Sequence, residues 1–314
     1  MRRILAGLLA ALLIITLAAC GRDRAAPETG KLQVVATIFP PYDFVRAIAG
    51  DRVELTMLLP PGAESHSYEP SPQDMVTIQN SGLFICVGGK SEAWVEEVLK
   101  AVGRDDLVVL RLMDMVDAVE EEHVEGMEAA EEEHGEEAEY DEHVWTSPKN
   151  AIRIVEKIAQ TLCDLDEENA PAYRQAAEVY IGKLEELDET FEEIVSGAVR
   201  KTIVFGDRFP FRYFADAYGL DYYAAFPGCA EQSEPSARTV AFLIDKVQAE
   251  GIPVVFCVEM SSGKIADAIC EATGARKRLL HSCHVVSRDD FLAGKTYLEL
   301  MEENAVALKE ALWE

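Results

Sequence analysis

The sequence predicts an α/β protein of two lobes, each a parallel sheet flanked by helices, with one long helix bridging them. Short runs rich in β-branched residues alternate with helical patterns in both halves of the chain, which is typical of parallel sheets covered on both faces. Between the halves lies a helical pattern of about eight turns. The chain has 314 residues, 49% of them apolar, which is enough for two cores.

The first residues predict export from the cytoplasm. Two arginines precede an apolar run at 4–17, which is too short for a comfortable membrane span and matches a signal-peptide core. The run closes on Leu-Ala-Ala-Cys-Gly around Cys20, which resembles the cleavage box of bacterial lipoproteins, where the cysteine is lipidated. The alternative is an ordinary signal peptide with a chance cysteine. We therefore predict an extracytoplasmic protein anchored to the bacterial membrane, with a signal peptide at 1–19 and a tether at 20–31.

Both lobes are predicted to contain four strands. In the first lobe, 32–146, Ser71 followed by Pro72 has the pattern of a helix N-cap with proline in the first turn. Its predicted strands are 32–37, 53–59, 83–87 and 107–110, and its predicted helices are 42–49, 71–80 and 92–101. In the second lobe, 199–314, the predicted strands are 201–205, 220–226, 253–258 and 277–280, and the predicted helices are 211–218, 236–249, 262–272 and 296–312.

The segment 147–198 between the lobes is predicted to be helical. Its longest helix, 168–198, has an apolar stripe with alternating four- and three-residue steps, and the opposite face is acidic. The stripe consists of Tyr173, Ala177, Tyr180, Leu184, Leu187, Phe191 and Ile194. A coiled-coil dimer is a competing interpretation. We interpret the helix as a strut that packs on the lobes of a monomer.

The charge excludes some classes of partner. The sequence has 57 acidic and 29 basic residues and a formal net charge of -28. Such an acidic protein is repelled by nucleic acids and anionic lipid surfaces, and it attracts cations. Nucleic-acid binding is therefore not expected.

Polar residues that follow the predicted strands indicate a metal site. Ligands of open parallel sheets bind in the crevice beyond the carboxyl ends of the strands. If the two lobes face each other, these residues converge with His143, which ends the first lobe. Imidazoles with one or two carboxylates suit a divalent transition metal, and histidine-rich sets suit zinc best. The residues beyond strand ends are His66, Asp207, Glu259, His281 and His284.

Several of these residues have alternative roles. Glu259 could accept a hydrogen bond that orients a ligand histidine, without binding the metal itself. Asp207 could cap the following helix or form an ion pair with a nearby arginine. Cys283 lies between two histidines and could bind the same ion, pair with Cys229 or stay free.

An acidic run at 117–142 precedes His143 and contains no lysine or arginine. A solvated, disordered loop is the ordinary interpretation of such a run. The sharper hypothesis is that His123, His134 and neighbouring carboxylates bind zinc weakly and pass it to the site between the lobes.

Three motifs resemble a known family. They are Gly-Ala-Glu-Ser-His-Ser-Tyr-Glu-Pro-Ser-Pro at 62–72, Asp-Glu-His-Val-Trp-Thr-Ser-Pro at 141–148, and Tyr-Phe-Ala-Asp-Ala-Tyr-Gly-Leu at 213–220. Together with the lipoprotein box they resemble the metal-binding solute-binding lipoproteins of bacterial zinc and manganese ABC importers. The resemblance implies two bridged α/β lobes, metal binding by His66 and His143, and an ABC permease as partner.

The chain departs from the family at two positions. Where the family usually has a third ligand, this chain has Gly206 followed by Asp207, and His281 stands where the family usually has an aspartate. We expect His66, His143, His281 and His284 to bind the metal, with Asp207 as the first substitute. Such an imidazole-rich set favours zinc over manganese, which prefers oxygen ligands.

The expected function is metal capture and delivery without catalysis. A zinc hydrolase is an alternative, which would need an open coordination position and a general base such as Glu259. A metal-binding surface adhesin or buffer without a transporter is another, because the fold alone does not decide function.

Overall fold

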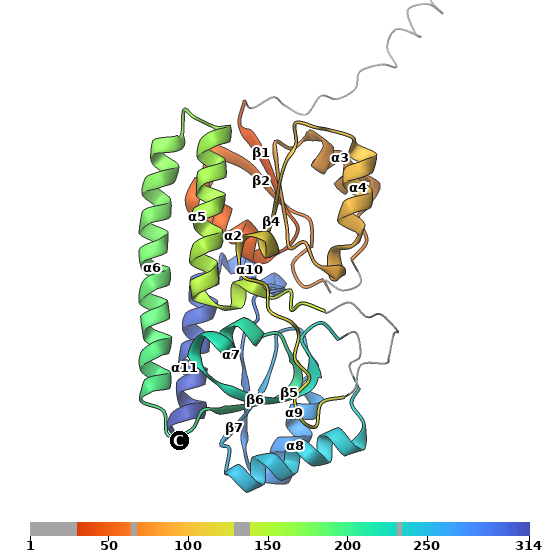
Figure 1. Ribbon diagram of the computed structural model, residues 1–314, viewed down its shortest axis with the longest axis vertical. Coiled ribbons are helices and arrows are strands. Elements are labelled where there is room, and N and C mark those ends of the chain that lie inside the picture. The colour runs from red at the N-terminus through yellow and green to blue at the C-terminus, as the bar shows by residue number, and fades with distance from the viewer. Residues whose placement is uncertain (1–29, 64–67, 129–138, 231–233) are drawn as a thin grey trace, which may run out of the picture. The chain divides into compact units, whose positions relative to one another are not determined.

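The computed structural model describes residues 30–63, 68–128, 139–230 and 234–314 (Figure 1). The chain divides into two units, 1–31 and 32–314, and the following description concerns the second. The predicted signal peptide and Cys20 lie outside the described residues. Within the described ranges, no helix has the length and apolar character needed to cross a membrane.

The first sheet contains four parallel strands in the order β2-β1-β3-β4. Neighbouring residues of β1 face opposite sides: Val34 packs with α2, whereas Val35 packs with residues of α3 and α4. The two faces are therefore both covered by helices, as the apolar strands require. The elements are β1 (Leu32–Ala36), α2 (Phe39–Ala49), β2 (Val53–Met57), α3 (Pro72–Asn80), β3 (Leu83–Cys86), α4 (Trp94–Val102) and β4 (Val108–Arg111).

The second sheet repeats this architecture with the order β6-β5-β7-β8, again all parallel. One face packs against α8 and α9, and the other joins the large core that contains α7 and α11. The elements are β5 (Thr202–Phe209), α7 (Arg212–Tyr218), β6 (Asp221–Pro227), α8 (Ala237–Glu250), β7 (Val254–Cys257), α9 (Lys264–Thr273), β8 (Arg276–Leu279), α10 (Arg288–Ala293) and α11 (Tyr297–Trp313). The predicted α/β class is confirmed.

A long helix connects the two sheets. Helix α6 (Ala170–Ser196) lies beside α5 (Pro148–Leu165) and α11, and it also contacts α2 of the first sheet and α7 of the second (Figure 1). All seven residues of the predicted apolar stripe are buried. The stripe is thus covered by helices of the same chain, as expected for a strut.

Besides shifts of one or two residues at several ends, the structure differs from the predictions at two boundaries and by one additional helix. Helix α2 begins at Phe39, so Pro40 and Pro41 lie in its first turn, where a missing N–H costs no hydrogen bond. Strand β5 continues through a register shift to Phe209, so Asp207 lies inside the strand and not after it. Helix α10 was not predicted. At α3, by contrast, the predicted cap of Ser71 is confirmed by a complete capping box with Asp74.

The expectation of a disordered acidic run is wrong for its described ends, although several of their side chains are exposed as expected for a solvated segment. Residues 119–121 and 139–141 pair as a short ribbon, in which Glu121 N donates to Glu139 O at 2.8 Å and Asp141 N donates to Val119 O at 3.0 Å. Further along, Glu128 N donates to Ala225 O of β6 at 3.0 Å. These residues pack on the second lobe because it offers hydrogen-bond partners that composition does not reveal.

Candidate metal site

Two of the predicted ligands, His143 and His284, lie together. His143 precedes α5 and His284 follows β8, and their ring centroids are 5.2 Å apart. The ring of Trp145 completes the cluster, with its centroid 5.6 Å from that of His143 and 5.2 Å from that of His284. The two histidines are only 2% and 8% exposed. Imidazoles contributed by the two halves of the chain therefore meet in a buried place, although they are far apart in sequence.

Asp141 orients His143. Its Oδ1 accepts the backbone N–H of His143 at 2.8 Å and lies 3.2 Å from Nδ1 of the same residue. A proton held on Nδ1 by this carboxylate leaves Nε2 as the ring atom that could coordinate a metal. Burial by itself would lower the pKa of His143, because it disfavours the charged imidazole. The carboxylates of Asp141, Glu142 and Glu121 together have the larger effect, so the pKa of His143 is raised. A metal at this ring would therefore have to compete with protons.

Glu259 orients the loop that carries His284. Its two carboxylate oxygens accept from Ser282, at 2.7 Å from the backbone N–H and 2.5 Å from the hydroxyl. The Ser282 hydroxyl in turn accepts the backbone N–H of His284 at 3.2 Å, and Trp145 Nε1 donates to Ser282 O at 2.8 Å. Glu259 thus acts on His284 through Ser282, and a role in orienting a metal ligand stays a prediction.

His281 points to a different neighbour. Its Nε2 is 3.3 Å from Oε2 of Glu303 on α11, and its backbone N–H donates to Asn304 Oδ1 at 2.7 Å. Cys283 beside it is fully buried, and burial raises the pKa of its thiol well above the usual value. Cys229 and Cys283 are both free thiols in this structure.

The β5 region offers no histidine. Asp207 accepts backbone N–H groups with both oxygens, from Arg208 at 2.9 Å and from Val258 at 3.4 Å. Gly206 lies against α9, where an added Cβ would be 2.5 Å from Ala266 N. The backbone of α9 therefore explains why a larger residue does not occupy position 206.

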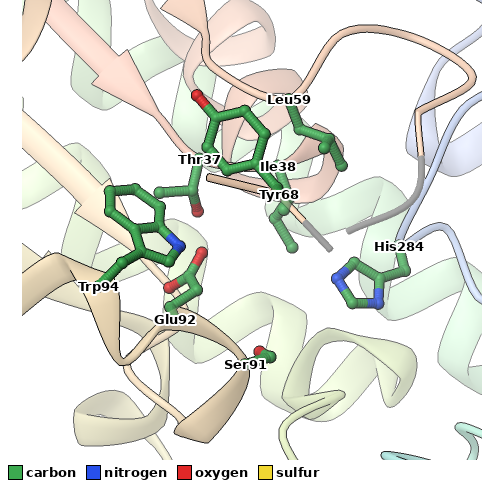
Figure 2. A pocket seen from close by; sticks show the side chains of 8 residues that line it. All are labelled: Thr37, Ile38, Leu59, Tyr68, Ser91, Glu92, Trp94 and His284. Carbon is green, nitrogen blue, oxygen red and sulfur yellow. The ribbon is translucent and has the colours of Figure 1, made fainter. Parts of the chain in front are cut away.

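A pocket adjoins His284 (Figure 2). The His284 ring lies on the opposite side of the pocket from Glu92 and Trp94, while Tyr68, two residues after His66, forms another wall. His66 itself lies outside the described residues, as does His134. His123 is described and exposed on the acidic run. The eight lining residues are Thr37, Ile38, Leu59, Tyr68, Ser91, Glu92, Trp94 and His284.

Sequence reasoning did not identify Glu92, although it lines this pocket. Its Oε2 accepts the backbone N–H groups of Val87 and Gly88, at 2.6 and 3.1 Å. Burial nonetheless raises its pKa to about 7. The double glycine at 88–89 after a predicted strand was the available signal, because such turns expose amides that a nearby carboxylate can accept.

We expect the stability of the protein to depend on Glu92 protonation. The pKa of Glu92 in the folded protein, about 7, lies above its usual value of 4.5, so the folded state holds the proton more tightly and loses stability as pH rises from about 4.5 to 7. Glu92→Gln should therefore raise the free energy of unfolding at pH 8 by about 3 kcal/mol, and by little at pH 4.5. Urea unfolding at both pH values measures this. Glu97→Gln, on the exposed side of α4, is the control, and an equal effect of both changes would contradict the prediction.

No three His, Cys, Asp or Glu side chains are grouped so that they could hold a metal ion, within the residues that the structure describes. Within these residues, the candidate ligands that lie together are the two imidazoles of His143 and His284.

Comparison with known proteins places these features in context. A family model described as zinc-uptake complex component A, periplasmic (ZnuA) matches residues 34–311. The high-affinity zinc uptake system protein ZnuA of Bacillus subtilis is 32% identical over 302 residues, which cover 95% of this chain and 94% of that protein. The zinc-binding lipoprotein AdcA of Streptococcus pneumoniae is 32% identical over 304 residues, which cover 96% of this chain and 60% of AdcA. The crystal structure of the Zn(II)-bound ZnuA-like domain of that AdcA has a TM-score of 0.74 and 29% identity, and the match covers 91% of this chain and 100% of the domain.

Proposed function

We propose that this chain, which belongs to the family of periplasmic zinc-uptake components, captures zinc outside the cytoplasm and delivers it to an ABC permease. The observation that supports this function most directly is the buried pair of His143 and His284, with ring centroids 5.2 Å apart. Two imidazoles held in place by carboxylate and serine contacts form a site for binding. Zinc is here the cargo, and no chemical step is involved.

The proposed ligand set is His66, His143 and His284. His66 is included because of its family motif and because Tyr68, two residues later, lines the pocket beside His284. His281 and Asp207 rank behind these three, since Glu303 already neighbours the His281 ring and backbone amides already occupy the Asp207 carboxylate. Three imidazoles favour zinc over manganese.

The proposed ligands come from both halves of the chain, and this provides a way to release zinc. A permease that parts the two lobes would pull the ligands away from the ion. Metal binding also needs neutral imidazoles, so affinity should fall as pH decreases. The raised pKa of His143 should start this loss at a higher pH than an ordinary histidine would.

We propose cleavage of residues 1–19, lipidation of Cys20 and a tether at 20–31, which would keep the binding unit near its permease. A monomer is proposed because the apolar stripe of α6 is already buried within the chain. Capture of zinc by His123 and His134 on the acidic run stays a prediction.

Metal analysis of the purified mature protein tests the function. We expect one zinc ion per chain, bound more tightly than manganese in competition with a chelator, and no zinc-dependent hydrolysis of ester, peptide or phosphate substrates. Turnover of such a substrate would support the hydrolase instead. Failure to bind zinc would contradict the proposed function.

A further inference from the structure

Asp141 is held by three separate contacts, and only one of them involves His143. Its backbone N–H donates to Val119 O at 3.0 Å, and its backbone carbonyl accepts from the Tyr213 hydroxyl at 2.8 Å. Its Oδ1 faces the backbone and ring of His143. Asp141 is 1% exposed, so these contacts are not exchanged with water.

The Tyr213 hydroxyl joins both ends of the acidic run. Besides donating to Asp141 O, it accepts the backbone N–H of Val119 at 3.1 Å. Val119 and Asp141 also bond to each other, so the hydroxyl closes a small ring of hydrogen bonds at the base of the ribbon. Tyr213 itself is buried in α7 of the second lobe.

A close backbone approach fixes Asp141 from another side. An added Cβ at Gly228 would lie 2.9 Å from Asp141 Oδ2 and 2.9 Å from Phe209 O. Only glycine leaves room for the carboxylate in this place. The second lobe thus confines Asp141 through Tyr213 at its carbonyl and through Gly228 at its side chain.

We propose that Tyr213 is a positioning residue for the metal site, because it fixes the backbone of Asp141 and thereby the orientation of the His143 imidazole. This inference rests on the proposed function, since it assumes that His143 binds zinc. The hydroxyl does not touch the ion. It acts by keeping the Asp141 carboxylate where it can hold the proton of His143 Nδ1, so that Nε2 is ready to bind before the metal arrives. Outer contacts of this kind typically change metal affinity by about 10- to 100-fold.

Tyr213→Phe removes the hydroxyl and keeps the ring that packs in the core. We expect zinc affinity, measured by chelator competition, to fall about 10-fold, mainly through faster release. In the metal-free protein with ¹⁵N-labelled histidine, the ring nitrogens of His143 should change from one tautomer to a mixture. If the Tyr213 hydroxyl only stabilised the fold, its removal would lower the urea midpoint of unfolding and leave the His143 signals unchanged.

Tyr222→Phe is the matched control. Its hydroxyl also contacts the acidic run, by donating to Glu122 Oε2 at 3.1 Å, but it does not bond to Asp141. It should leave the zinc affinity and the His143 signals as in the unmodified protein. Equal behaviour of the two variants, or an unchanged affinity and tautomer in Tyr213→Phe, would overturn the inference.

Two further variants separate the possible failures. If His143→Ala loses zinc binding while Tyr213→Phe does not, the proposed site stands and only the positioning role is rejected. If His143→Ala binds zinc normally, the proposed ligand set is wrong. Should Tyr213→Phe fail to fold, Gly228→Ala displaces Asp141 with Tyr213 intact. Changed His143 ring signals would then support the inference that the position of Asp141 sets the orientation and tautomer of His143, and unchanged signals would reject it.

Discussion

Replacement of His143 or His284 with alanine is expected to weaken zinc binding by at least about 100-fold, the upper end of the effect of losing an outer partner. Each change removes one of two imidazoles that meet with ring centroids 5.2 Å apart. Affinity is measured by competition with a chromophoric chelator at pH 7.5. Each variant should also lower the unfolding midpoint of the metal-free protein somewhat, because removing a buried ring leaves a cavity, so affinity is measured at a temperature where the variant is folded.

His281→Ala is the informative control for this experiment. The residue is only three positions from His284, yet its ring faces Glu303 on α11. Zinc affinity should therefore change little. A loss as large as that of His284→Ala would show that His281 is a ligand and that the ligand set proposed above is wrong.

Substitution of Gly206 by alanine is expected to destabilise the protein by about 3 kcal/mol, as overpacking against a fixed backbone does. The new Cβ would lie 2.5 Å from Ala266 N and 2.6 Å from Ala266 Cα. These are backbone atoms of α9, so they cannot move aside as a flexible side chain would. Urea unfolding of the metal-free protein measures the loss.

Gly182→Ala is the matched control on α6. Nothing lies within 4 Å of the Cβ that would be added there, and glycine is a poor helix former. The change should stabilise the protein by about 1 kcal/mol. If Gly206→Ala behaved like Gly182→Ala, the close packing of β5 on α9 would be refuted.

The local signals in the sequence were sufficient for most of the elements. Ser71 and Pro72 predicted the start of α3 because a capping side chain and a preset φ angle act within one turn. The stripe of α6 predicted a buried face because its spacing follows the helical period. The extension of β5 was missed, since it depends on pairing with β6 through a register shift and not on local propensity.

The candidate site was predicted only in part. His143 and His284 were named from their places after sequence elements, and the structure brings them together. The same reasoning named His281, which has an equivalent position in sequence. Glu303 of α11 distinguishes the two, and no pattern near His281 reveals that contact.

The sequence by itself determined the α/β class and the long strut, because hydrophobic periodicity and helix caps are local features of the chain, and it named His143 and His284, which the structure brings together. The tertiary structure alone decided which groups surround each histidine and how the acidic run is anchored. Glu121 accepts from Cys229 N at 2.8 Å, and Glu128 accepts from Ser236 N at 2.6 Å, both across more than a hundred residues. Such contacts depend on how distant elements pack, and neither charge nor spacing along the chain encodes them directly.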